Sequence, residues 1–84
     1  MIEDTLLNKL EKRLSDYIKE IDYKISTKPY STNMELDKNR NLIYLSEYQV
    51  LATAINKNGM TVSLSIIPSK NAIFIENQLV KNLD

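Results

Sequence analysis

"NKNGMTVSLSII", residues 56–67, decides the fold because it contains the only glycine of the 84-residue chain, Gly59, directly after Asn58. An Asn-Gly pair between two segments of alternating polarity predicts a β-hairpin, since a two-residue type I′ turn needs positive φ at both central positions. A loop of two residues places Lys57 opposite Met60. The sequence therefore predicts a strand on each side of Gly59, paired in this register.

The predicted register also sorts the side chains of the hairpin onto two faces. With Ile55 opposite Val62 and Leu51 opposite Ile66, the larger apolar residues share one face. A shift by one residue exchanges the faces of one strand, so the hydrophobic pattern and the turn support the same register. The other face is expected to be small and nearly uncharged. It would carry Ala52, Ala54, Thr61, Ser63 and Ser65.

The N-terminal part of the chain predicts one long amphipathic helix over residues 4–27. Apolar residues recur three or four positions apart, which gives one apolar stripe along a helix. The stripe includes Leu7, Leu10 and Leu14. Proline restricts the residue before it, so Lys28-Pro29 is expected to end the helix. A polar loop over residues 28–41 would follow.

The segment "NLIYLSEYQVLATAI", residues 41–55, admits two interpretations. A single strand of this length is too long, so the first interpretation has a strand that bends near Ser46-Glu47. The second has a helix over residues 46–58 that ends at Gly59. We favour the strand, because residues 60–67 otherwise have no pairing partner.

These elements predict an α+β fold in one domain, with the helix packed on an antiparallel meander of three or four strands. The meander would span residues 42–76, with the hairpin turn at residues 58–59. "AIFIE", residues 72–76, is expected to be its last strand and an uncovered edge that invites pairing with another chain. Residues 77–84 would form a tail with helical character.

Composition narrows the class of function. Basic and acidic residues number 11 each, so no net charge draws the chain toward nucleic acid or anionic lipid. It has no cysteine, no apolar run of about 18 residues and no segment like a signal peptide. These features predict a cytoplasmic protein. Frequent Asn, Lys and Ile are typical of AT-rich coding DNA, which favours a low-GC bacterium or one of its phages as the source.

Catalysis is not expected. The chain lacks histidine and cysteine, which removes the commonest general base, thiolate nucleophiles and most zinc sites. One glycine is too few for a phosphate-binding loop. We therefore predict no catalytic residue, no cofactor and no metal site.

The remaining class is a small protein-binding module that docks on a larger protein as an inhibitor or adaptor and associates with itself as a dimer. Tyrosines beside small residues suit a protein interface. The expected sheet interface comprises Tyr44, Tyr48, Ala52, Ser63 and Ser65. The long helix would extend beyond the sheet, which makes Leu7, Leu10 and Leu14 candidates for helix pairing between two chains.

The alternative is a small nucleic-acid-binding regulator. Four basic residues gather near the predicted end of the helix and in the loop after it, with Tyr23 and Tyr30 between them for base stacking. They are Lys24, Lys28, Lys38 and Arg40. Three acidic residues in the same region cancel most of their charge.

Overall fold

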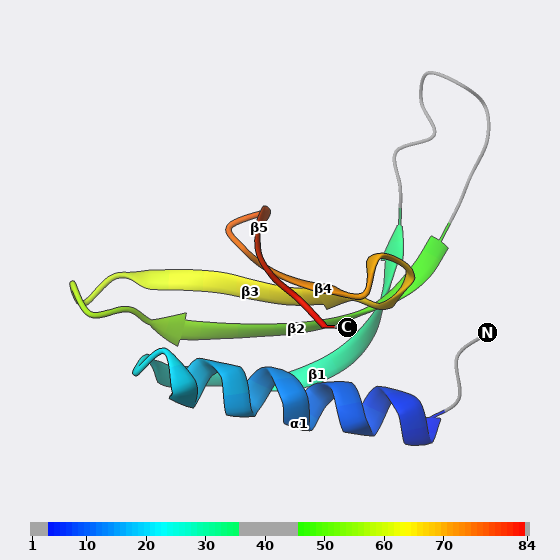
Figure 1. The fold of residues 1–84 in the computed structure, drawn as a ribbon, viewed down its shortest axis with the longest axis horizontal. Helices are drawn as coiled ribbons and strands as arrows, with labels where there is room; N and C mark the ends of the chain where they lie inside the picture. Colours follow the sequence, from blue (N-terminus) through cyan, green and yellow to red (C-terminus); the bar gives the residue numbers. More distant parts are fainter. Residues whose placement is uncertain (1–3, 36–45, 84) are drawn as a thin grey trace.

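The computed structural model describes residues 4–35 and 46–83. One helix packs on a five-stranded antiparallel meander in which every strand pairs with the next one along the chain (Figure 1). The elements are α1 (Asp4–Glu20), β1 (Lys24–Glu35), β2 (Ser46–Ile55), β3 (Thr61–Ile67), the 3₁₀ turn η1 (Pro68–Lys70), β4 (Ala72–Ile75) and β5 (Gln78–Asn82). The α+β class is confirmed. The sheet is larger than expected, because two segments predicted to be loop and tail form strands.

The helix ends earlier than the prediction of residue 27, because the chain reverses at Asp22. This residue has φ of 64°, in the left-handed region that often ends helices. Tyr23 N donates to Ile18 O and Asp22 N donates to Lys19 O, each at 3.0 Å, which is the hydrogen-bond pattern of a Schellman motif. The last turns of the predicted helix are therefore not helical, and the chain enters β1 at Lys24.

The polar loop expected from residue 28 is wrong for the part that the structure describes, because β1 continues to Glu35. Pro29 is accommodated because β1 is an edge strand and its register against β2 shifts between Thr27 and Tyr30. Proline has no N–H group and is tolerated at such irregular edge positions. Residues 36–41 of the predicted loop lie outside the described residues.

Residues 46–55 form a strand, so the favoured interpretation is confirmed and the helix over residues 46–58 is wrong. The predicted hairpin register, however, is wrong by one residue: Ile55 faces Thr61, and Ala52 faces Leu64. The loop holds three residues, since Asn56 N donates to Met60 O at 2.8 Å. The Asn56 side chain also accepts from the N–H groups of Asn58 and Met60, at 2.9 Å each, which holds this longer loop.

A turn with two left-handed central residues does exist, but it joins β4 to β5. Glu76 and Asn77 have φ of 49° and 67°, as a type I′ turn requires, and Ile75 pairs with Gln78 across them. Residues 78–82 are therefore a strand rather than a helical tail. This strand covers β4, so the prediction that residues 72–76 form an open edge is wrong.

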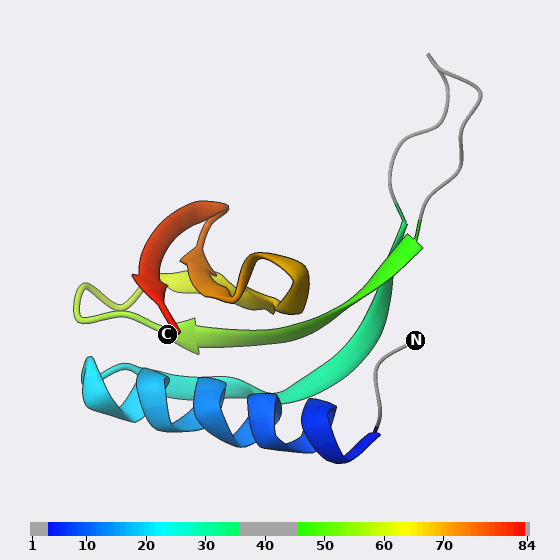
Figure 2. The same ribbon diagram turned by 45° about the vertical axis from the view of Figure 1, so that its right-hand side comes forward.

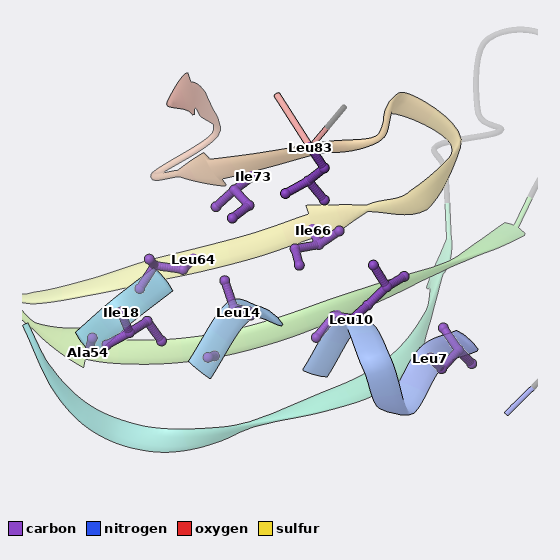
Figure 3. Packing of buried hydrophobic residues seen from close by; sticks show 11 residues of the cluster. Leu7, Leu10, Leu14, Ile18, Ala54, Leu64, Ile66, Ile73 and Leu83 are labelled. Atoms are coloured by element: carbon purple, nitrogen blue, oxygen red, sulfur yellow. The ribbon is translucent and has the colours of Figure 1, made fainter. Parts of the chain in front are cut away.

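The sheet curves around α1 (Figure 2). Both of its edge strands contact the same helix: Ser31 of β1 donates to Glu11 at 2.7 Å, and Lys81 of β5 lies 3.7 Å from the Glu20 carboxylate. Between them, the apolar stripe of α1 packs on the inner face of the sheet (Figure 3). The buried cluster comprises Leu7, Leu10, Leu14, Ile18, Val50, Ala52, Ala54, Leu64, Ile66, Ile73 and Leu83.

Candidate functional site: the outer face of the sheet

The structure places the residues predicted for helix pairing in the interior of the chain itself. Leu7, Leu10 and Leu14 all belong to the buried cluster, and Leu14 has no exposed surface. The helix ends at Glu20, short of the predicted length, so its stripe is covered within one chain. Leu7, Leu10 and Leu14 therefore leave at most 8% of their surface accessible to a second helix.

The residues predicted for the sheet interface do not lie together. Ala52 is 2% exposed and faces α1, because the three-residue loop exchanges the two faces of β2 relative to the prediction. Tyr48 is half-buried against the same inner cluster. Ser63 and Ser65 do lie on the outer face, as expected. Tyr44 lies outside the described residues.

A continuous row of side chains crosses the outer face instead. The residues are direct neighbours across successive strands, from β1 to β5: Tyr30, Leu51, Ser65, Phe74 and Leu79. We call this set the outer row. Its two ends are open to solvent, with Tyr30 47% and Leu79 56% exposed, whereas Leu51 and Phe74 are half-buried. Ser65, at the centre, is only 8% exposed because larger neighbours flank it on both sides.

Beside the outer row, hydroxyl groups replace the apolar side chains. The Thr53 hydroxyl donates to the Thr27 hydroxyl at 2.7 Å across β2 and β1, and Thr53 also pairs with Ser63 of β3. The Glu76 carboxylate accepts from the Ser63 backbone N–H at 2.6 Å. The charged groups Lys24 and Glu76 therefore lie at the margins of this face, while no member of the outer row carries a charge.

Shallow clefts lie at another place, where the C-terminal end of α1 meets the β2–β3 turn. A cleft of about 300 Å³ is lined by Tyr17, Tyr23 and Lys57, among others, and a second of about 440 Å³ shares Tyr23 and Lys57 with it. Burial, followed by the nearby Glu20 carboxylate and Tyr23, raises the pKa of Tyr17 above its usual value of 10.0. The described residues that line these two clefts include no histidine and no cysteine.

The basic residues of the alternative prediction are only partly described. Lys24 and Lys28 are exposed on β1, and Lys38 and Arg40 lie outside the described residues. Of the two tyrosines, Tyr23 is half-buried and lines both clefts, and Tyr30 is exposed at one end of the outer row. In the part of the chain that is described, no three His, Cys, Asp or Glu residues gather as a metal site.

Sequence reasoning missed four members of the outer row: Tyr30, Leu51, Phe74 and Leu79. Two of them lie in segments predicted to be loop and tail, and Leu51 was assigned to the inner face by the incorrect register. Asn56 was the sequence signal for the three-residue loop. An asparagine side chain at the start of a turn can accept hydrogen bonds from backbone N–H groups further along the chain, and these hydrogen bonds stabilise a longer loop.

No protein-family model matches the chain, and no curated protein or solved structure is significantly similar to it. Among the described helices, none is long and apolar enough to cross a membrane.

Proposed function

We propose that this chain is a small, non-catalytic protein-binding module that docks on a larger protein, as an inhibitor or adaptor, through the outer face of its sheet. The observation that carries the proposal is the outer row: a contiguous, uncharged row with an aromatic and an aliphatic side chain on each side of its centre. Aromatic residues are enriched in interfaces and charged residues are depleted at their centres. Scattered apolar residues are ordinary on a surface, but a continuous row across five strands is not.

The polar surroundings of the row support the same proposal. The Thr27–Thr53 hydrogen bond and the margin formed by Lys24 and Glu76 give the outer row a hydrated rim. An apolar centre with a polar rim is the usual anatomy of a protein interface. Binding through this face requires neither a cofactor nor a metal.

The test is capture of partners from a lysate of the native host by the tagged chain, compared with two charged variants. Leu79→Glu introduces a charge at an exposed end of the outer row. Leu6→Glu is the matched control, since Leu6 is a similarly accessible leucine, 47% exposed, on α1. We expect the wild-type chain and Leu6→Glu to recover the same protein, and Leu79→Glu to lose it. Recovery by all three would refute the outer face as the binding surface.

The same experiment includes a nuclease-treated half and a salt series, which test the nucleic-acid alternative. Phosphate contacts weaken steeply between about 50 and 200 mM salt, whereas an apolar interface responds little. Recovery that nuclease abolishes, together with loss on Lys28→Glu, would favour the alternative over the protein-binding module.

A further inference from the structure

We infer that the outer row is the dimerisation surface of this chain, with a second copy packed face to face against it. This inference rests on the binding surface proposed above and names its occupant. A larger partner must then displace the second copy, since both use the same side chains.

The order of side chains along the outer row is self-complementary. A two-fold axis parallel to the strands places β1 over β5 of the second copy and β3 over β3. Tyr30 then lies over Leu79 of the second copy, Leu51 lies over Phe74, and Ser65 lies over Ser65. Both pairs join an aromatic to an aliphatic side chain. Such isologous contacts are what a symmetric dimer requires.

The exposure of the side chains differs along the row. Ser65, the smallest member, lies between the larger Leu51 and Phe74 and is only 8% exposed. Tyr30 and Leu79, at the two ends, are 47% and 56% exposed. The ends therefore offer a second copy the most apolar surface, and they are the positions at which a substitution tests the contact.

Electrostatics do not oppose the contact of two identical faces. Equal numbers of basic and acidic residues leave the chain with no formal net charge, so two copies experience no net repulsion. The outer row itself has no charge to desolvate. A face that contacts its own copy must avoid like charges at its centre, and this one does.

The edges of the sheet are poorly suited to association by strand pairing. β1 contains two register shifts and Pro29, and β5 has only five residues with a register shift opposite Ile73 and Phe74. Irregular, short and proline-containing edges discourage continuous sheets between chains. The face is therefore the better surface for a second copy.

The size of the face predicts weak association. Strands about 4.8 Å apart and about seven residues long, at about 3.3 Å per residue, give a face of roughly 500 Å². Two copies then bury roughly 1,000 Å², which is the lower limit for a specific interface. We expect a dissociation constant of roughly 10 to 100 µM.

Sedimentation equilibrium of the purified chain at about 5 to 500 µM tests this inference. Wild type and Leu6→Glu should dimerise, and Leu79→Glu should raise the dissociation constant at least about tenfold. Tyr30→Lys should weaken the dimer similarly. Circular dichroism verifies that each variant is folded, as expected for substitutions at exposed positions. A wild-type chain that stays monomeric at the highest concentration, or a Leu79→Glu variant that dimerises normally, would overturn the inference.

Mixing the two weakened variants tests the two-fold arrangement. One Tyr30→Lys chain and one Leu79→Glu chain would form a heterodimer in which the introduced ammonium group meets the introduced carboxylate, while the second Tyr30–Leu79 contact is retained. The mixture should therefore dimerise more strongly than either variant alone, and absence of this rescue would refute the arrangement.

Dimerisation and partner capture remain separable. Loss of capture by Leu79→Glu together with a monomeric wild type would overturn the inference and support the proposed function. A dimer that Leu79→Glu disrupts, together with capture that this variant leaves unaffected, would support the inference and overturn the proposed function.

Discussion

The two faces of the sheet differ both in their composition and in what covers them. The inner face carries Val50, Ala52 and Ala54 of β2, none more than 2% exposed, beneath the apolar stripe of α1. The outer face of the same strand carries Leu51, which is half-buried and lacks such a helix. On β2, small residues thus lie where the helix approaches closely and the larger Leu51 lies on the open face. On β3 the order is reversed, with Leu64 and Ile66 inside and Ser63 and Ser65 outside. The sizes of the residues on a single strand are therefore a poor guide to which face of a sheet is the core.

The largest expected difference between the faces comes from introducing one charge. Ala52→Lys buries an ammonium group without a partner beneath α1, at a cost of several kcal/mol, which is comparable to the roughly 4 to 12 kcal/mol expected for the whole chain. We expect this variant to lose its cooperative urea transition, followed by far-UV circular dichroism. Ser63→Lys is the control, because Ser63 is exposed on the outer face near Glu76. Equal loss of stability in both variants would contradict the assignment of the faces.

Replacing one leucine on each face with alanine compares how much the two faces contribute to the free energy of unfolding. Leu64 is fully buried, so Leu64→Ala leaves a cavity and should lower the free energy of unfolding by about 2 to 5 kcal/mol. Leu51→Ala removes a half-buried side chain and should cost only about 1 kcal/mol. Urea titrations at low micromolar concentration keep self-association out of the comparison. Similar losses at the two positions would show that the outer face is covered as well.

The β2–β3 turn determines which residues of the hairpin lie on the inner face, and Gly59 is its position in the left-handed region, which glycine adopts without strain. Gly59 has φ of 82°, and a Cβ atom added to it would meet no other atom within 4 Å. Gly59→Ala therefore carries only a backbone cost, of about 1 to 2 kcal/mol. Gly59→Asn should cost less, because asparagine tolerates the left-handed region. Thermal unfolding compares both with Lys57→Ala, an exposed loop position where almost no change is expected. A neutral Gly59→Ala would contradict the three-residue loop.

The smallest expected effect concerns the hydroxyl pair on the outer face. Thr27 and Thr53 share a hydrogen bond of 2.7 Å at an exposed cross-strand position. A double-mutant cycle with Thr27→Val and Thr53→Val should give a coupling of about 0.5 kcal/mol, typical of cross-strand pairs. Zero coupling in urea titrations would mean that water satisfies the two hydroxyls separately and that their hydrogen bond does not order the rim of the outer row.

The helix shows which features a local sequence pattern can predict and which it cannot. Its apolar spacing correctly predicted the face that Leu7, Leu10 and Leu14 bury, because periodicity is a property of the segment alone. The prediction ended the helix before Pro29, but the chain leaves it at Asp22, where a left-handed residue other than glycine closes the motif. Aspartate is compatible with that conformation without being diagnostic of it, so the sequence contained no strong stop signal before the proline.

The outer row shows what local pattern could not provide. Tyr30 and Leu79 lie far apart in the sequence and become ends of one row only after four strand pairings are in register. Each register depends on a turn or a bulge, and an error of one residue at any of them reverses a face. The error at Asn56 had this consequence for Ala52.

The sequence by itself determined the α+β class, the amphipathic helix, the hairpin around Gly59 and the lack of histidine and cysteine chemistry, because these follow from composition and short-range periodicity. Tertiary structure decided the end of the helix, the strands at both edges, the pairing register and therefore the residues of the outer row. The physical reason is that pairing energy and burial accumulate over contacts between distant segments. They outweigh the local preferences of segments such as β1 and β5, whose own patterns favour loop or helix.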